Sequence, residues 1–420
     1  MYCIVYLALS LAATVSVDIL DNADGEWVAP GYSVTERVLI DPYDYVTAIE
    51  NDPRNIACQA FFVDTEQGEK WRVIMVGSDK LVVLQEDREA PLEVVLPFSA
   101  YGAIYSRGGY FVIVRYGTAD MNMDQALYVD IDRNVTKYFD PTPDGRWCHG
   151  MAVSDNGVVT AIGKDYILDF DENLALSSIR EYEETHFGYK CTSATDEIIV
   201  MENVYDSPRE IMAFDWDGNQ LWETDIGERA VVTQLAASED GSLVGASFIK
   251  EGISVIDGNT GRILWERYDG MQTSTIAFSP DGTHMAITVP LEVGELPNSF
   301  VITDTGDQYD DNDEIWCIPS RKWYYIFPDM INNNTNVLFH SQDVECLQIT
   351  RICLLDSDGV LIWSSEPVKS DERSFIPFGN SFNLDYHLLG PPHALSMTDS
   401  RVVYQGEDGV TIITVSNEAE

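Results

Sequence analysis

Short runs of apolar, β-forming residues alternate along the chain with tight polar turns that contain Asp and Gly. In three of these turns an Asp opens the turn and a Gly stands four residues before a Trp on the next run. Asp caps the turn backbone, and Gly adopts the positive φ that other residues resist. Apolar runs on both sides of such a turn predict a β-hairpin. The copies are Asp215 to Trp222, Asp257 to Trp265 and Asp356 to Trp363.

A second kind of turn precedes the first along the chain. Its clearest copy is Ser279-Pro280-Asp281-Gly282, which lies between the apolar residues 276–278 and 285–287. Pro at the second position and Gly at the fourth are typical of a type I turn. Residues 235–244 and 151–159 have related patterns. Two hairpins in each unit predict units of four strands.

The residues that open the outer turns recur at intervals of roughly 40–50 residues, the period of four-stranded propeller blades. We therefore predict an all-β fold, a single β-propeller of four-stranded blades. Eight units can be delimited, and seven blades is the alternative if the first or last unit is irregular. The turn-opening residues are Asp130, Asp169, Asp215, Asp257, Asp304 and Asp356. The units span about 57–96, 101–140, 147–180, 190–227, 231–268, 272–316, 322–366 and 371–416.

These units place the propeller domain at residues 57–416, with a tail at 417–420. In the N-terminal segment 19–56, residues 33–40 form a β-like run that we expect to complete the last blade. Joining N- and C-terminal strands in one blade would leave no open seam in the ring. Helix periodicity is nearly absent, and residues 177–184 are the best candidate for a short helix.

Asp257 to Trp265 resembles the hallmark of PQQ-like (quinoprotein) propeller repeats, Asp-x-x-Thr-Gly-Lys-x-x-Trp, with Arg262 in place of the Lys. Residues 277–282 look like the first hairpin of WD40-like and YVTN-type propellers. The resemblance implies a propeller whose repeated Trp residues, Trp222, Trp265 and Trp363, pack between neighbouring blades. It does not imply an enzyme: quinoprotein alcohol dehydrogenases have adjacent cysteines, which this chain lacks, and it also lacks a Cys-x-x-Cys-His haem motif.

Residues 2–17 carry no charge and are too short for a typical membrane span. They suit the core of a secretory signal, so residues 1–18 are interpreted as a signal peptide. No Lys or Arg precedes the run, and a buried first strand is the alternative. Without another spanning segment, we expect a secreted, periplasmic or cell-surface protein with no integral membrane segment after signal removal. In an exported protein Cys346 and Cys353 could pair, although buried thiols are an equal alternative.

The formal net charge is −45, from 70 acidic and 25 basic residues. Self-repulsion of this size keeps a protein soluble and monomeric, and it opposes binding to nucleic acid. An acidic surface suits a saline environment, where salt screens the charges. It also suits a surface that holds divalent cations, and composition does not separate the two.

The densest acidic stretch is the candidate Ca²⁺ site, because closely spaced carboxylates supply the oxygen ligands that Ca²⁺ requires. The alternative is a solvated loop. No other metal and no organic cofactor is predicted. Cys148 and His149 have nucleophile-and-base chemistry, but adjacent residues of a strand point to opposite faces, so we do not expect catalysis there. The candidate ligands are Asp307, Asp310, Asp311, Asp313 and Glu314.

No Gly-x-Ser-x-Gly elbow, Walker-type loop or Gly-x-Gly-x-x-Gly fingerprint occurs in the chain. We therefore expect a non-catalytic binding or scaffold protein that recognises a protein, peptide or glycan. The alternative is a propeller enzyme, either a quinone- or metal-dependent oxidoreductase or a hydrolase or lyase, with its site at the central channel. Two segments, Asn134-Val135-Thr136 and Asn333-Asn334-Thr335, match the N-glycosylation sequon.

Overall fold

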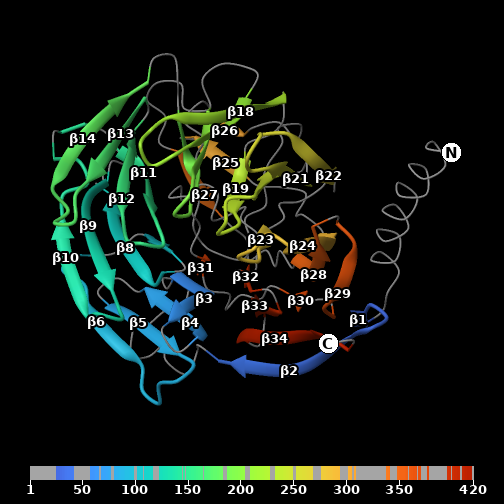
Figure 1. Cartoon of the computed structure of the whole chain (residues 1–420). Helices are drawn as coiled ribbons and strands as arrows, with labels where there is room; N and C mark the ends of the chain where they lie inside the picture. The colour runs from blue at the N-terminus through green and yellow to red at the C-terminus, as the bar shows by residue number, and fades with distance from the viewer. Residues whose placement is uncertain are drawn as a thin grey trace.

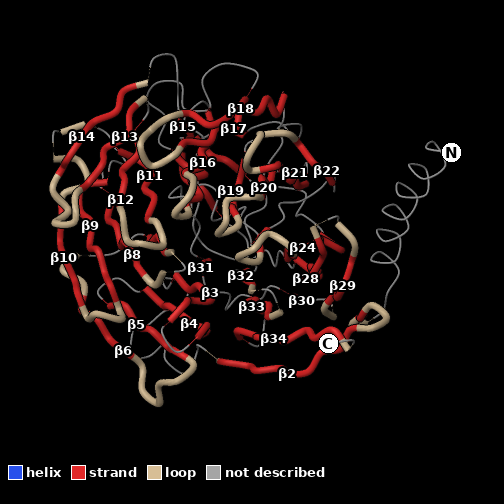
Figure 2. The backbone as a smooth tube through the Cα atoms, in the orientation of Figure 1, coloured by secondary structure: helices blue, strands red, loops and turns tan. Residues whose placement is uncertain are grey.

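The protein is built from β-strands, and no helix occurs among the residues that the computed structural model describes (Figure 2). The described residues are 25–418 without 42–56, 66–67, 77–79, 99–101, 107, 117–122, 144, 147, 164, 183–186, 204–208, 228–231, 249–251, 268–275, 294–300, 305–306, 309–336, 341–347, 358, 367, 370–375, 378–394, 399 and 407–408.

Seven sheets in the described part of the chain contain four antiparallel strands in series, and they stand around a ring (Figure 1). We call each series a blade and number the blades along the chain. Blade 1 is β3 (Ala57–Thr65), β4 (Gly68–Val76), β5 (Lys80–Gln85) and β6 (Leu92–Val95). Blade 2 is β7 (Gly102–Tyr105), β8 (Tyr110–Tyr116), β9 (Met123–Asp130) and β10 (Val135–Phe139). Blade 3 is β11 (Cys148–Val153), β12 (Val159–Gly163), β13 (Tyr166–Phe170) and β14 (Leu176–Glu181).

The other blades follow the same order. Blade 4 is β15 (Phe187–Ala194), β16 (Ile199–Asn203), β17 (Arg209–Phe214) and β18 (Gln220–Gly227). Blade 5 is β19 (Val232–Ala237), β20 (Leu243–Phe248), β21 (Gly252–Asp257) and β22 (Ile263–Arg267). Blade 6 is β23 (Ile276–Phe278), β24 (His284–Val293), β28 (Gln348–Asp356) and β29 (Leu361–Ser364). Blade 7 is β32 (Leu395–Met397), β33 (Arg401–Gly406), β34 (Gly409–Asn417) and β2 (Tyr32–Ile40).

The prediction of eight blades is not confirmed, because two of the expected units share one sheet. β23 and β24 come from unit 272–316, whereas β28 and β29 come from unit 322–366, and β24 pairs directly with β28. The residues between them contribute a separate three-stranded sheet instead of completing two blades. Its strands are β25 (Val301–Asp304), β26 (Asp307–Gln308) and β27 (Val337–His340).

The hydrophobic core lies between the blades. Successive residues of a strand point to opposite faces, and here both faces are buried. In β11, Met151 and Val153 pack toward blade 2, whereas Ala152 packs toward blade 4. Seven clusters of buried side chains each join two consecutive blades, including blades 7 and 1. Burial on both faces explains why the inner strands read as continuous apolar runs.

An N-terminal strand closes the ring. β2 pairs with β34 from Tyr32↔Asn417 to Ile40↔Val410, so both ends of the chain contribute to blade 7 (Figure 1). This is the place that the sequence analysis assigned to residues 33–40. The short β1 (Trp27–Val28) pairs with the outer strand of blade 6. Two further short strands extend sheets: β30 (Val368–Lys369) pairs with β28, and β31 (Ile376–Pro377) pairs in parallel with β3.

The repeated Trp residues lie between blades, as the resemblance implied. Trp222 is buried against blade 5, and its Nε1 donates to the Gly258 carbonyl oxygen (2.5 Å) in the outer turn of that blade. Trp265 packs against the core between blades 5 and 6. Trp363 is fully buried between blades 6 and 7. The prediction of a short helix at residues 177–184 is wrong, because residues 176–181 form β14, the outer strand of blade 3.

Candidate functional site

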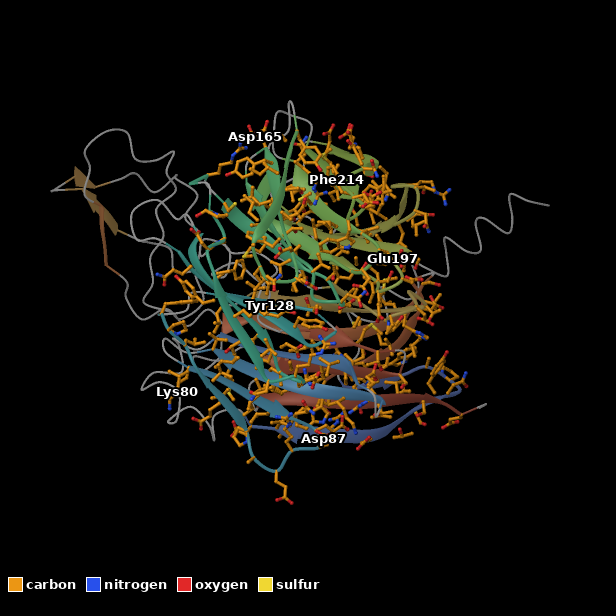
Figure 3. The ribbon with its side chains drawn as sticks, turned by 60° about the vertical axis from the view of Figure 1, so that its left-hand side comes forward. Lys80, Asp87, Tyr128, Asp165, Glu197 and Phe214 are labelled. Atoms are coloured by element: carbon orange, nitrogen blue, oxygen red, sulfur yellow. The ribbon has the colours of Figure 1, made fainter. Side chains whose placement is uncertain are left out.

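The antiparallel order gives the ring two different faces. The hairpin turns between first and second strands, and between third and fourth strands, lie on one side, which we call the turn face. The connections between second and third strands, and between successive blades, lie on the other side, the connection face. In Figure 3 Glu197, from a turn in blade 4, is at the right, and Lys80, which follows a connection in blade 1, is at the left.

Turns of the second kind, which join the first and second strands of a blade, are stabilised by a hydroxyl. Ser238 accepts a hydrogen bond from the Leu243 amide (2.9 Å) and donates to Asp240 Oδ1 (2.7 Å). The Ser279 turn has the same geometry: the Ser279 hydroxyl accepts from the His284 amide (2.9 Å) and donates to Asp281 Oδ1 (2.9 Å). Hydrogen bonds from neighbouring hydroxyls and amides lower the pKa of Asp281, although partial burial opposes this shift. These carboxylates therefore stabilise turns through Oδ1.

The buried hydroxyl recurs around the ring, and sequence reasoning missed it. A Ser or Thr opens the first turn in six blades, and all six residues are buried. Within the described residues, five of the hydroxyls accept a hydrogen bond from a backbone N–H of their own turn. The exception is Ser106. The Ser or Thr that follows the first apolar run of each of these units was the signal, and only two of the six precede an Asp-Gly pair. The six residues are Ser106, Ser154, Thr195, Ser238, Ser279 and Thr398.

Neighbouring turns on this face also hold one another. The Gly108 amide donates to Asp155 Oδ1 (3.1 Å), which links blade 2 to blade 3. The Asn156 amide donates to Asp196 Oδ1 (2.9 Å), which links blade 3 to blade 4. The Asp240 amide donates to the Pro280 carbonyl oxygen (3.1 Å), which links blade 5 to blade 6. The recurring polar groups of the turn face thus contribute to architecture.

The outer turns behave in the same way. Asp215 Oδ1 accepts from the Asn219 amide (2.7 Å), and Gly218 has a φ of 87°. The side chain of Asn219 is the largest cause of the lowered pKa of Asp215. The prediction that Asp169 opens an outer turn is wrong, because Asp169 lies inside β13. Its carboxylate makes an ion pair with Arg180, and the turn is opened by Asp171, which accepts from the Ala175 amide (3.0 Å).

An ion pair between a buried Arg and an exposed Asp crosses from blade 1 to blade 2. Arg72 is fully buried in β4, its Nε donates to Gln85 Oε1 (2.7 Å), and its Nη2 donates to Asp132 in the outer turn of blade 2. Burial lowers the pKa of Arg72, and Asp132 opposes this shift. Gly109 leaves room for the guanidinium, since a Cβ there would lie 2.6 Å from Nη1. The pair joins two blades through a buried guanidinium and an exposed carboxylate.

The predicted site residues are brought together only in part. Of the candidate Ca²⁺ ligands, Asp307 lies in β26, whereas Asp310, Asp311, Asp313 and Glu314 are outside the described residues. Cys148 is fully buried at the start of β11. Cys353 is also buried, and its suggested partner Cys346 is outside the described residues. No group of three or more His, Cys, Asp or Glu side chains in the described ranges could hold a metal ion.

The connection face is where the blades differ. Residues 164–165 suffice to connect β12 to β13, whereas residues 294–347 connect β24 to β28 and include the sheet β25–β27. That sheet projects from the connection face at the far left of Figure 3. No helix in the described part of the chain is long and apolar enough to cross a membrane.

No known protein family and no curated protein matches the chain. Similar solved structures include BamB from Moraxella catarrhalis, with a TM-score of 0.42, 13% identity and 91% of this chain covered against 97% of that chain. Virginiamycin B lyase from Staphylococcus aureus has a TM-score of 0.47 and 10% identity over 92% and 99% of the two chains. A streptogramin B lyase has a TM-score of 0.45 and 11% identity, and the match covers 92% of this chain and 98% of that chain. At these scores neither the activities nor the partners of those proteins are carried over to this chain.

Proposed function

We propose that this protein is an exported, non-catalytic β-propeller that binds a protein, peptide or glycan through its connection face. The observation that carries the proposal is the inserted sheet β25–β27, which projects from that face. Loops and insertions held by a rigid scaffold are the common place for recognition. Because the fold itself hosts many functions, the proposal rests on this face and not on the ring.

The opposite face supports the same assignment by its chemistry. Its recurring side chains cap turns, as Ser279, Asp281 and Asp215 do, or join blades, as Asp155 does. Groups with the same structural role in most blades do not distinguish one partner from another. The differences between blades lie in the connections, where the segment 294–347 is unlike the short link at 164–165.

The net charge defines the class of partner. With 70 acidic against 25 basic residues, the surface repels nucleic acid and other polyanions. A basic or neutral protein, a peptide or an uncharged glycan meets no such repulsion. The same self-repulsion favours a monomer.

The repeat type and the location are parts of this proposal. We infer PQQ-like repeats related to YVTN-type propellers, supported by the Asp257 to Trp265 motif and by the position of Trp222 against the next blade. We infer export to the periplasm, the cell surface or the medium, supported by the uncharged run 2–17. The mass of the mature N-terminus tests export, and loss of residues 1–18 is expected.

The binding proposal is tested by affinity capture with two variants of the full chain. In one, residues 294–347 are replaced by a short Gly-Ser linker. The other carries Asp87→Asn and Glu89→Gln, which alter exposed residues of a blade 1 turn. We expect the first variant to lose a partner that the wild type and the second variant both retain. Thermal unfolding confirms that the blades remain folded. Equal capture by all three proteins would contradict a site on the connection face.

The enzyme alternative predicts something different. A site at the central channel would bring acids or His residues from several blades to the axis, with perturbed pKa values. Incubation of the purified protein with quinone-linked alcohol substrates, and with ester, glycoside and lactone substrates, distinguishes the classes. Turnover that survives replacement of residues 294–347 would favour the enzyme over the binding protein.

A further inference from the structure

One sequence motif is not explained by turn capping or core packing. Asn134 lies in the outer turn of blade 2, and Thr136 follows in β10, so the sequon Asn-Val-Thr starts in a turn and ends on an outer strand. Both side chains are exposed. Within the described residues neither the side-chain amide of Asn134 nor the hydroxyl of Thr136 has a hydrogen-bond partner. We propose that Asn134 is an N-glycosylation site.

The backbone alone explains Asn134 but not Thr136. Asn134 has a φ of 52°, and its amide donates to the Ile131 carbonyl oxygen (3.3 Å), as the Gly218 amide donates to Asp215. Asn tolerates this conformation better than most residues, so Asn134 by itself has a structural reason. Thr136 suits a strand by its β-propensity, but no contact within the described residues requires its hydroxyl. The position two residues beyond the corresponding Gly is occupied by Gln220 in blade 4 and by Ile263 in blade 5.

The site satisfies the requirements of the reaction. The Asn134 amide nitrogen Nδ2 attacks C1 of the first sugar of an oligosaccharide carried on a lipid phosphate. The Nδ2–C1 bond forms, the bond from C1 to the phosphate oxygen breaks, the amide proton passes to a base of the transferase, and the lipid phosphate leaves. The Thr hydroxyl two residues later is the part of the sequon that the transferase requires. An exposed rim position accommodates the saccharide without disturbing the core.

The inference rests on the export part of the proposed function, since N-glycosylation takes place on chains that leave the cytoplasm. It does not depend on the binding part. A glycan on the turn face side of the rim would leave the connection face accessible. The two proposals can therefore fail separately.

The test is peptide mass spectrometry of the full-length gene product isolated from the organism that makes it. We expect the peptide with Asn134 to carry a saccharide mass. Thr136→Ala should abolish this mass and Thr136→Ser should retain it. Thr136→Ala keeps the positive-φ Asn, so folding is preserved. Asn173→Gln, an exposed Asn of the blade 3 turn without a Thr or Ser two residues later, should leave the mass unchanged.

Two results would overturn the proposal, and they are distinguishable. A mature chain that has lost residues 1–18 but carries an unmodified Asn134 would show that the sequon is not used. An unmodified chain that still begins at Met1 inside the cell would remove the glycan and the export proposal together. Capture of a partner by the connection face is measured independently and would be unaffected by the first result.

Discussion

Asp281 illustrates how carboxylates function at the scale of the residue. Its Oδ1 accepts from the Thr283 amide (2.9 Å) and the Ser279 hydroxyl (2.9 Å), and these bonds lower its pKa below the ordinary value of 3.8. A group whose pKa is lowered in the folded state stabilises that state above its unfolded pKa. The stabilisation disappears as the pH falls through the folded pKa.

The first prediction follows from this sign. Asp281→Asn should be less stable than the wild type near pH 7, because the amide cannot accept charge-assisted bonds as well as the carboxylate. The difference in unfolding free energy should shrink below a pH of about 4 and vanish when both proteins are uncharged at this position. Urea unfolding from pH 7 to pH 2 measures it. Glu89→Gln, which removes an exposed charge, is the control, and a pH-independent difference would be contrary to the assignment.

The second prediction concerns the Trp between blades. Trp222→Ala should lower the unfolding free energy by roughly 3–5 kcal/mol, because it opens a cavity between blades 4 and 5. Trp222→Phe should cost about 1–3 kcal/mol, since it leaves the Gly258 carbonyl oxygen without its donor. Leu221→Ala removes an exposed neighbour and should stay within about 0.5 kcal/mol. Chemical denaturation compares the three, and similar losses at residues 221 and 222 would argue against packing between blades.

At the scale of the element, the N-terminal strands pair with two sheet edges that would otherwise be exposed. β2 covers β34 and β1 covers β29. Glu26 connects the two, since its carboxylate accepts from Trp363 Nε1 (3.0 Å) and from Arg37 Nη2 (2.6 Å). An uncovered strand edge is a template for pairing with another chain.

The third prediction is that removal of residues 1–40 destabilises the ring and promotes association. Val38 and Ile40 pack on the core between blades 7 and 1. Loss of this packing should cost at least about 2 kcal/mol. The bare β34 should also cause concentration-dependent oligomers, which light scattering detects. Removal of residues 1–24 spares both strands and serves as the control. A 1–40 deletion that stayed monomeric and fully stable would contradict closure by β2.

At the scale of the whole molecule, charge is the dominant property. A formal charge of −45 opposes the compact state through repulsion among the 70 carboxylates. Seven ion pairs are formed within the described residues, among them Arg401 with Glu86 and Arg146 with Glu181, and they offset little of this repulsion. Screening by salt is therefore expected to stabilise the fold.

The fourth prediction is that Tm rises with NaCl concentration. The Debye length falls from about 10 Å at 0.1 M to about 3 Å at 1 M, so most repulsion between surface carboxylates should be screened at about 1 M. Differential scanning fluorimetry across this range measures the effect. NaCl and KCl should act alike, because screening depends on ionic strength. A flat Tm would show that the acidic surface does not limit stability.

The fifth prediction separates Ca²⁺ binding from screening. If Asp307, Asp310, Asp311, Asp313 and Glu314 bind Ca²⁺, CaCl₂ should raise the unfolding free energy beyond NaCl of equal ionic strength. The gain should be about 2.7 kcal/mol at a concentration of 100 Kd. Asp310→Asn with Asp311→Asn should remove this extra gain. Equal effects of the two salts would leave the stretch as a solvated loop.

Turn chemistry explains how much of the fold could be predicted. Asp215, Gly218 and Trp222 act within one hairpin, so their spacing was sufficient to place a turn and a strand. The Ser/Thr of the first turns was equally local, but it was missed because only two of the six residues, Ser238 and Ser279, are followed by the Asp-Gly pair that marks a turn. For the candidate Ca²⁺ site, the sequence showed only that several carboxylates lie close together near residue 310. Ligand geometry depends on how distant segments meet, and local spacing does not contain it.

By itself, the sequence determined the all-β class, the two kinds of hairpin and the four-strand unit, because apolar periodicity and Asp-Gly turns act over a few residues. Tertiary structure decided that residues 276–293 and 348–364 share blade 6, since the pairing of β24 with β28 bridges an insertion that has turn signals of its own. It also decided which neighbour each side of a strand faces, because both sides are apolar. The two faces of the ring, and with them the surface left for a partner, follow from those nonlocal pairings.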